Sequence, residues 1–289
     1  MPIGRHSRIA GPFQLSMEDA VDAAVPMPWT VCYYLEAPVE REDPPLPGAD
    51  DRDGFASAFP DGLPWRDEGR ALQLMVSLAR RLQGAVRVAG SPQVILPDPE
   101  RAVDHVVHSP VWLDPDVLVA VIGRELPNAR LAVESRDWGG PSDASYSGAL
   151  VGESLLADDP LTAEELHGLH AAADRVDLDV LAGDVVVDAF AVIGDQGHDG
   201  AVEVLVHLSD GDEPAVAAEP WADRDYVTYE IRWANPHPED RERRHPPESF
   251  VAARRRMAPR VVAVTRAVVE ATSGVVVDED GFRVDRYEL

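Results

Sequence analysis

The sequence contains no lysine, because all 26 of its basic residues are arginine. A Schiff-base lysine, a lysine-anchored pyridoxal phosphate and a phosphate-loop lysine are therefore excluded. The codon bias of a GC-rich bacterial genome is the favoured explanation, since alanine, valine, aspartate and proline are abundant as well, and salt adaptation is the alternative. The absence removes several catalytic classes and points to no function by itself.

Cysteine is almost absent too, with Cys32 as the single one. Intramolecular disulfides and multi-cysteine zinc or iron–sulfur sites are impossible for that reason. Cys32 lies between Val31 and Tyr33 in an alternating segment, which favours a small, half-buried side chain over a nucleophile that needs a base beside it. We expect no cofactor.

Long hydrophobic runs are also missing. The longest uninterrupted aliphatic run spans residues 117–122, whereas a helix needs about 20 apolar residues to cross a bilayer. Near the N-terminus, Gly11 and Pro12 interrupt the chain and acidic residues follow where a secretory signal needs an apolar segment. The sequence therefore predicts a cytoplasmic protein with no membrane contact.

Positive charge is scarce, with 52 acidic residues, a formal net charge of −26 and a pI near 4.5. Hydrophobic residues make up 45%, the level of a packed protein, so the acidity belongs to the surface of a folded chain. Such a surface repels phosphate backbones and anionic lipids. Nucleic-acid and membrane partners are not expected, although an acidic face could mimic nucleic acid toward a basic protein.

The charge is unevenly distributed along the chain. Residues 1–150 hold 13 arginines and 22 acidic residues, whereas residues 153–225 hold 2 and 19, and residues 226–289 hold 11 of each. Within the last segment, residues 241–260 contain seven arginines and two glutamates. We expect this basic cluster to meet carboxylates, either within the chain or on a second copy of it.

Hydrophobic periodicity and turn residues predict an alternation of strands and helices. Predicted helices cover residues 16–25, 65–83, 114–126, 162–176 and 248–273, the last with an interruption at Pro259. Predicted strands cover residues 29–37, 85–89, 93–96, 104–109, 129–134, 146–152, 185–193, 201–208, 226–234, 275–277 and 282–284. A long exposed loop is expected over residues 39–64.

This order predicts an α+β fold made of two ferredoxin-like mixed-sheet layers, each with helices packed on one face. The N-terminal half would cover residues 1–140 and the C-terminal half residues 141–289, with one compact unit as the alternative. Residues 30–38 and 228–236 are both strands ending in proline, and each precedes a loop, an apolar helix, a glycine and a hairpin. A degenerate internal duplication is therefore conceivable.

The helix predicted over residues 162–176 carries a weak candidate metal site. His167, His170 and Asp174 fall within roughly 60° of one another on a helical wheel, with Glu164 nearby. The opposite side is apolar, so the solvent face of an amphipathic helix explains the same residues. The histidine spacing also differs from that of the HExxH zinc motif. We favour the solvent face and expect no metal.

Two further segments could carry chemistry. His105 and His108 lie three residues apart on a predicted strand, so they should point to opposite faces and only one could line a site. Residues 138–148 have the glycines and hydroxyls of a binding loop but match no phosphate-binding or nucleophile-elbow pattern, and a linker is the simpler interpretation.

The arginine cluster is the remaining candidate site. Arg243, Arg244, Arg254, Arg255 and Arg256 could receive a phosphate or another anionic ligand, or could mediate contacts with carboxylates of the same chain or of a second copy. The second interpretation is favoured because the chain itself is so rich in carboxylates.

Three functional hypotheses follow, and no motif is specific enough to assign a family. The first is a protein without catalytic motifs that acts by protein–protein contact or self-association, as a homodimer. The second is a small-molecule hydrolase or metal-dependent enzyme with a site between the two halves, and the third is an acidic nucleic-acid mimic. A deep pocket containing two or more of His105, His108, His167, His170 and Asp174 would favour the enzyme, and a flat apolar patch around the sheet edge would favour the contact protein.

Overall fold

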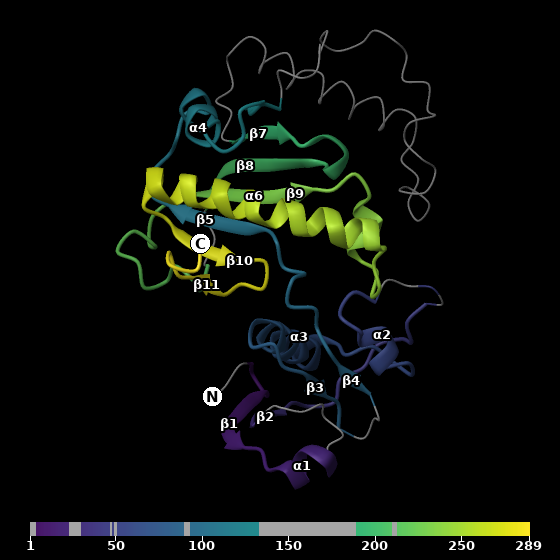
Figure 1. The fold of residues 1–289 in the computed structure, drawn as a ribbon. Coiled ribbons are helices and arrows are strands. Elements are labelled where there is room, and N and C mark those ends of the chain that lie inside the picture. Colours follow the sequence, from purple (N-terminus) through teal and green to yellow (C-terminus); the bar gives the residue numbers. More distant parts are fainter. Residues whose placement is uncertain are drawn as a thin grey trace, which may run out of the picture.

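The structure is a computed structural model that describes residues 4–22, 30–46, 48, 51–89, 93–132, 189–209 and 213–289. These residues form a mixed α+β fold with five α-helices and a main sheet of seven strands. Figure 1 shows this sheet with the helix α6 lying along it, and a smaller N-terminal part at the opposite end of the molecule. The α+β class predicted from the sequence is confirmed.

The main sheet has the strand order β11-β10-β5-β9-β8-β7-β6, and every neighbouring pair is antiparallel. Its strands are β5 (His105–Ser109), β6 (Arg130–Leu131), β7 (Ala189–Asp195), β8 (Ala201–Ser209), β9 (Tyr226–Ala234), β10 (Val275–Asp278) and β11 (Arg283–Val284). The strand β5 lies between β9 and β10, which come more than 100 residues later in the chain.

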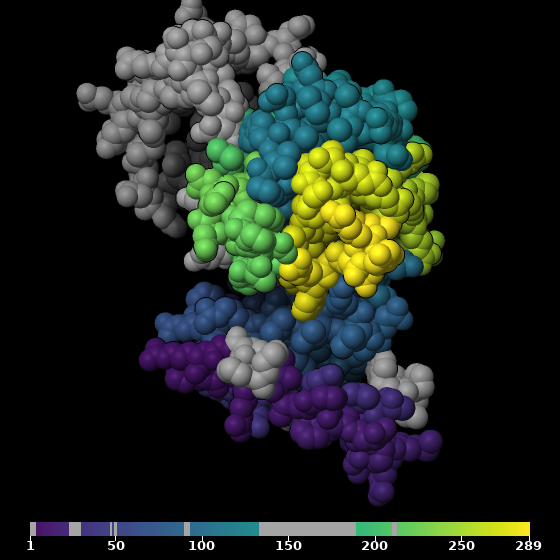
Figure 2. Space-filling model, turned by 90° about the vertical axis from the view of Figure 1, so that its left-hand side faces the viewer, coloured from purple at the N-terminus to yellow at the C-terminus, as the bar shows by residue number. Residues whose placement is uncertain are grey.

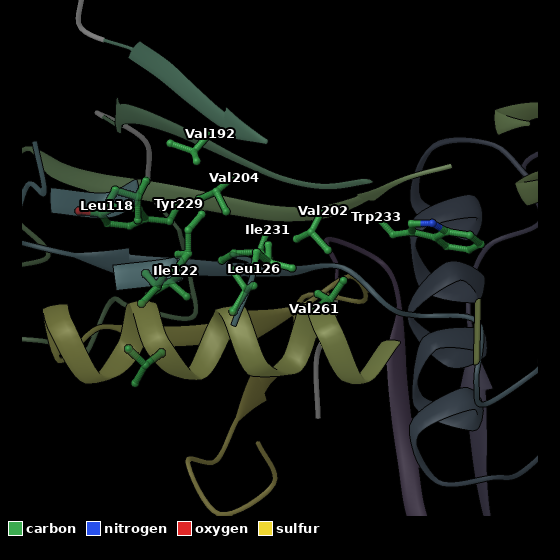
Figure 3. Packing of buried hydrophobic residues seen from close by; sticks show 14 of the residues in the cluster. Leu118, Ile122, Leu126, Val192, Val202, Val204, Tyr229, Ile231, Trp233 and Val261 are labelled. Carbon is green, nitrogen blue, oxygen red and sulfur yellow. The ribbon is translucent and has the colours of Figure 1, made fainter. Parts of the chain in front are cut away.

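One face of this sheet holds the main core. The helices α4 (Pro115–Ile122) and α6 (Glu248–Thr272) supply apolar side chains to the same cluster as the strands. Figure 3 shows Val204 and Ile231 of the sheet in this cluster with Ile122 and Val261. Each of these side chains is fully buried, which stabilises the fold by about 1.5–3 kcal/mol per side chain.

The helix α6 is continuous through Pro259, so the predicted interruption is wrong. Proline removes one backbone hydrogen bond inside a helix and leaves the carbonyl four residues earlier without its partner. Pro259 and Arg255 both lie on the exposed side of α6, where water can solvate that carbonyl.

The N-terminal part has its own elements and a second apolar cluster. It contains β1 (Arg8–Gln14), α1 (Met17–Asp22), β2 (Val31–Glu36), α2 (Phe55–Ala58), α3 (Arg66–Arg81), β3 (Val86–Arg87) and β4 (Val94–Ile95). The strands β1 and β2 form one antiparallel ribbon, and β3 and β4 form another. The predicted start of α1 is confirmed, since the backbone N–H of Asp19 donates to the Ser16 hydroxyl at 3.1 Å.

Arginines join the two parts of the molecule. Arg80 of α3 is almost fully buried and pairs with Asp53 and with Asp280, which follows β10. Arg254 of α6 pairs with Asp98 at 2.7 Å. The two apolar clusters are separate, and ion pairs such as these connect the N-terminal part to the main sheet and α6.

Two ferredoxin-like layers are not confirmed. The strands β5 and β6, which precede residue 140, belong to the same antiparallel sheet as β7 to β11. Local periodicity predicts each strand but carries no information on which distant strand will pair with it. The boundary at residues 140/141 lies outside the described residues. The division into two halves and the internal duplication remain predictions.

The remaining predicted elements have different outcomes. The strand expected over residues 146–152 and the helix over residues 162–176 lie outside the described residues. The loop over residues 39–64 contains the short helix α2 and an isolated bridge between Arg41 and Pro64, so it is only partly irregular. None of the helices in the described ranges is long and apolar enough to span a membrane.

Candidate functional site

The sheet face opposite α6 is polar at its centre. A pocket of about 690 Å³ opens there, and its lining includes His108, His207, Glu213, Tyr226, Thr228 and Glu230. Side chains alternate along β9, so Tyr229 and Ile231 enter the main core while Thr228 and Glu230 face the pocket. The strand register places Thr228 directly between His108 on β5 and His207 on β8.

His108 is a buried side chain of this pocket, with only 6% of its surface exposed. Its Nδ1 lies 3.1 Å from the hydroxyl oxygen of Thr228, and its ring meets the ring of Tyr226 edge-on at a centroid distance of 5.4 Å. Burial lowers the pKa of His108, although the carboxylates of Glu213 and Glu230 oppose this shift. The ring is therefore neutral at neutral pH.

His207 is held from both sides of its ring. Its Nε2 lies 3.1 Å from Oε1 of Glu230, and its Nδ1 lies 3.0 Å from the carbonyl oxygen of Leu208. Both partners are hydrogen-bond acceptors, and each of the two ring nitrogens has one of them as its neighbour. Glu230 also pairs with Arg232 on the same strand. A ring engaged in this way has no free nitrogen with which to act as a base.

His105 and His108 do occupy opposite faces of β5, as the strand period predicts. The Nδ1 of His105 lies 3.1 Å from the Thr265 hydroxyl on α6, although His105 also contributes to the wall of the pocket. Burial lowers the pKa of His105, and the nearby carboxylates of Asp278 and Asp104 partly offset this. The ring is thus a bonded part of the packing between β5 and α6.

Among the described residues, the pocket contains no complete catalytic triad and no metal-binding cluster. His108 bonds to a threonine hydroxyl, but no carboxylate orients its ring among the described residues, so a nucleophile–base–acid triad is not assembled. Within the described ranges, no group of three or more His, Cys, Asp or Glu side chains could hold a metal ion. The weak metal candidates His167, His170 and Asp174, together with Glu164, lie outside those ranges, as do residues 138–148.

The five candidate arginines are spread over different partners of the same chain. Arg254 and Arg255 approach Asp98 and Glu100, and Arg256 makes a two-pronged bond to Asp199. Arg243 pairs with Asp240 at 3.2 Å, and Arg244 lies 3.7 Å from Asp51. The structure therefore brings each arginine to a carboxylate and does not gather the five around one point.

A second candidate site lies on the N-terminal ribbon. We define the ribbon surface as the exposed apolar side chains of β1, α1 and β2, namely Phe13, Met17, Val21, Val31, Tyr33 and Tyr34. Between 44% and 70% of each of these residues is exposed. Figure 2 shows the N-terminal residues, in purple, gathered at the end of the molecule away from the main sheet.

The ribbon surface is ordered by its own packing. The rings of Phe13 and Tyr34 lie 5.4 Å apart, and the ring of Tyr33 covers Gly11 so closely that a Cβ there would come within 2.9 Å of it. Leu35, on the other hand, packs against the second apolar cluster beneath the ribbon. Cys32 is half-buried, as predicted.

Comparison with known proteins identifies no relative. No family model matches the chain, and neither a curated protein nor a solved structure matches it. The function must therefore be argued from the two candidate sites alone.

Sequence reasoning missed β1 and hence the ribbon. Gly11 and Pro12 interrupt the apolar pattern, and the structure places them where the register shifts between Ala10 and Phe13. A bulge of this kind hides a strand from any test of strict alternation. The polar face left a clearer signal, because Thr228, Glu230 and Arg232 alternate with buried residues along one strand.

Proposed function

We propose that this protein acts by protein–protein contact, with the ribbon surface as its contact site. The observation that carries this proposal is the exposure of six large apolar side chains on the ribbon and on α1, among them Phe13 and Tyr34, whose rings lie 5.4 Å apart. An exposed apolar patch on a folded protein commonly marks an interaction site. The aromatic residues of the patch, Phe13, Tyr33 and Tyr34, are of the kind that dominates the energetics of interfaces.

The limited cover of the ribbon supports the same proposal. A two-stranded sheet is marginally stable in water unless further strands or a packed helix support it. The ribbon has α3 and the second apolar cluster beneath it through Leu35, but Tyr34 is 60% exposed on its surface. A bound protein would cover this surface.

Sedimentation at about 0.05 M and about 0.5 M salt tests this proposal on the full chain. We expect concentration-dependent association that strengthens at high salt, because the net charge of −26 opposes contact between copies and salt screens it. Contacts made by the arginine cluster would weaken at high salt instead. A monomer at both salt concentrations would contradict the proposal.

Matched variants locate the contact. Phe13→Ser combined with Tyr34→Ser removes the exposed aromatic pair and should abolish association. Leu46→Ser, at a site 78% exposed outside the ribbon, serves as the control and should leave association unchanged. Equal effects of the two variants would place the contact elsewhere.

A small-molecule enzyme remains the second candidate, favoured by His108 at the pocket. The Nδ1 of His108 forms a hydrogen bond with the Thr228 hydroxyl, and no described residue forms one with its Nε2. A neutral imidazole with a free nitrogen can take part in proton transfer. If the wild-type chain hydrolyses ester or phosphate model substrates, His108→Gln should abolish this activity and the control Leu46→Ser should retain it. No turnover by the wild-type chain would contradict this candidate.

A further inference from the structure

The strand β2 (Val31–Glu36) has an edge that pairs with no other strand. Its hydrogen-bonded neighbour is β1, and the described residues place no other strand beside it. Among the described residues, no strand pairs with the backbone groups on this outer edge. An uncovered edge of this kind is a template for another extended strand.

The opposite edge of the ribbon is closed to such growth. Pro12 in β1 has no backbone N–H to donate, and the register shift between Ala10 and Phe13 bends this strand. Pairing at β2 alone adds one partner and then stops. A twofold contact between two copies of the chain meets this condition, because it uses the same edge on both.

We propose that two copies of this chain associate by antiparallel pairing of β2 with β2, with Tyr33 opposite Tyr33 of the second copy. This inference rests on the proposed contact function and names the partner. The two ribbons then form one four-stranded sheet of the order β1-β2-β2-β1.

The register follows from parity and charge. A twofold axis perpendicular to the sheet keeps each side chain on its own face. Two residues that face each other must therefore both have odd or both have even residue numbers. Centring on Tyr33 pairs Val31 with Leu35 and Cys32 with Tyr34, so that every facing pair between positions 31 and 35 is apolar or aromatic. The acidic Glu36 then lies beyond this pairing and is already bonded to Arg8 at 2.8 Å within its own copy.

The charge of the protein makes this edge a suitable meeting point for two copies. The net charge of −26 repels a second copy over most of the surface. Between Val31 and Leu35 the strand has no charged side chain.

Disulfide trapping of the full chain tests the register. Residues that face each other in an antiparallel pair have Cα atoms about 4.5–5.5 Å apart, within the range that a disulfide bridges. The chain offers a clean background, because Cys32→Ser removes its single cysteine. Cys32→Ser with Tyr33→Cys should form a covalent dimer on mild oxidation, and Cys32→Ser with Tyr34→Cys, as matched control, should not.

Hydrogen exchange of the wild-type chain provides a test that needs no substitution. Peptides covering residues 31–36 should gain protection as the protein concentration rises, because the outer-edge amides become hydrogen-bonded in the dimer. Tyr33→Lys should raise the dimer dissociation constant about tenfold or more, since charged edge residues oppose strand pairing. Leu46→Lys adds the same charge at an exposed site outside the ribbon and should change it little.

The outcomes separate the two proposals. A dimer that forms without concentration-dependent protection of residues 31–36, or that is trapped at position 34 and not at 33, overturns the strand pairing and leaves the contact function standing. A chain that stays monomeric at every concentration and salt overturns both. Trapping at position 33 together with protection of β2 supports both.

Discussion

Removing the Arg80 guanidinium should destabilise the joint between the N-terminal part and the main sheet. The Arg80 side chain is only 3% exposed and lies 2.5 Å from Asp53, with Asp280 as its second partner. Asp280 is itself 8% exposed and also accepts a hydrogen bond from Ser77 at 2.9 Å. Breaking a buried pair by removing one partner leaves an unpaired charge and costs about 3–5 kcal/mol. We expect Arg80→Met to lose this amount, a large share of the about 5–15 kcal/mol typical of a folded protein.

The neighbouring Arg81 provides the matched control. It pairs with Asp278 at 2.7 Å and Glu288 at 3.1 Å, but 32% of its side chain is exposed. Water screens such a pair, so Arg81→Met should cost about 0–1 kcal/mol. Urea unfolding followed by tryptophan fluorescence and circular dichroism measures both losses. Equal losses for Arg80→Met and Arg81→Met would refute the reasoning that burial makes the Arg80 contacts important.

A double variant tests whether the loss arises from the unpaired carboxylate. Combining Arg80→Met with Asp280→Asn removes one of the two charges that Arg80→Met leaves behind. The double variant should therefore be more stable than the sum of the two single losses implies, by about 1 kcal/mol or more. Additive losses would mean that Arg80 and Asp280 do not interact in the folded chain.

Two further variants test local features of the fold. Burial alone would raise the pKa of Glu279, but the nearby Arg241 and Arg52 outweigh this effect and hold the pKa below its usual range. The ionised Glu279 carboxylate therefore stabilises the fold fully above about pH 4.5, and this contribution is lost as the pH falls through the lowered pKa. Glu279→Gln should therefore be less stable than wild type at neutral pH and lose less on acidification in urea titrations, whereas the 60% exposed Glu239→Gln should behave like wild type. At Gly200, φ is +94° and a Cβ would come within 2.2 Å of the Ala234 carbonyl oxygen, so Gly200→Ala should lower the free energy of unfolding by at least about 1–3 kcal/mol. Gly197→Ala, at φ +66° with no atom within 4 Å, should cost less in the same thermal or urea assay, and the reverse order would contradict the clash.

The helices and central strands were predictable because their signals are local. The apolar stripe of α6 and the polar–apolar alternation of β9 arise from neighbours a few positions apart in the chain. The strand β1 was not predictable in this way, since Gly11 and Pro12 break its alternation and yet fit at the bulge in the paired ribbon. The ribbon surface escaped prediction together with the strand.

The sequence by itself determined the α+β class, the excess of acidic charge and the absence of lysine chemistry. Only the tertiary structure decided that β5 enters the sheet between β9 and β10, and thereby that Thr228 lies between His108 and His207. It also decided which carboxylates pair with the five candidate arginines and with Arg80, whose partner Asp280 lies 200 positions away. The physical reason is that periodicity reports which face of an element is buried, whereas strand pairing and ion pairing depend on which distant segments the folded chain brings together.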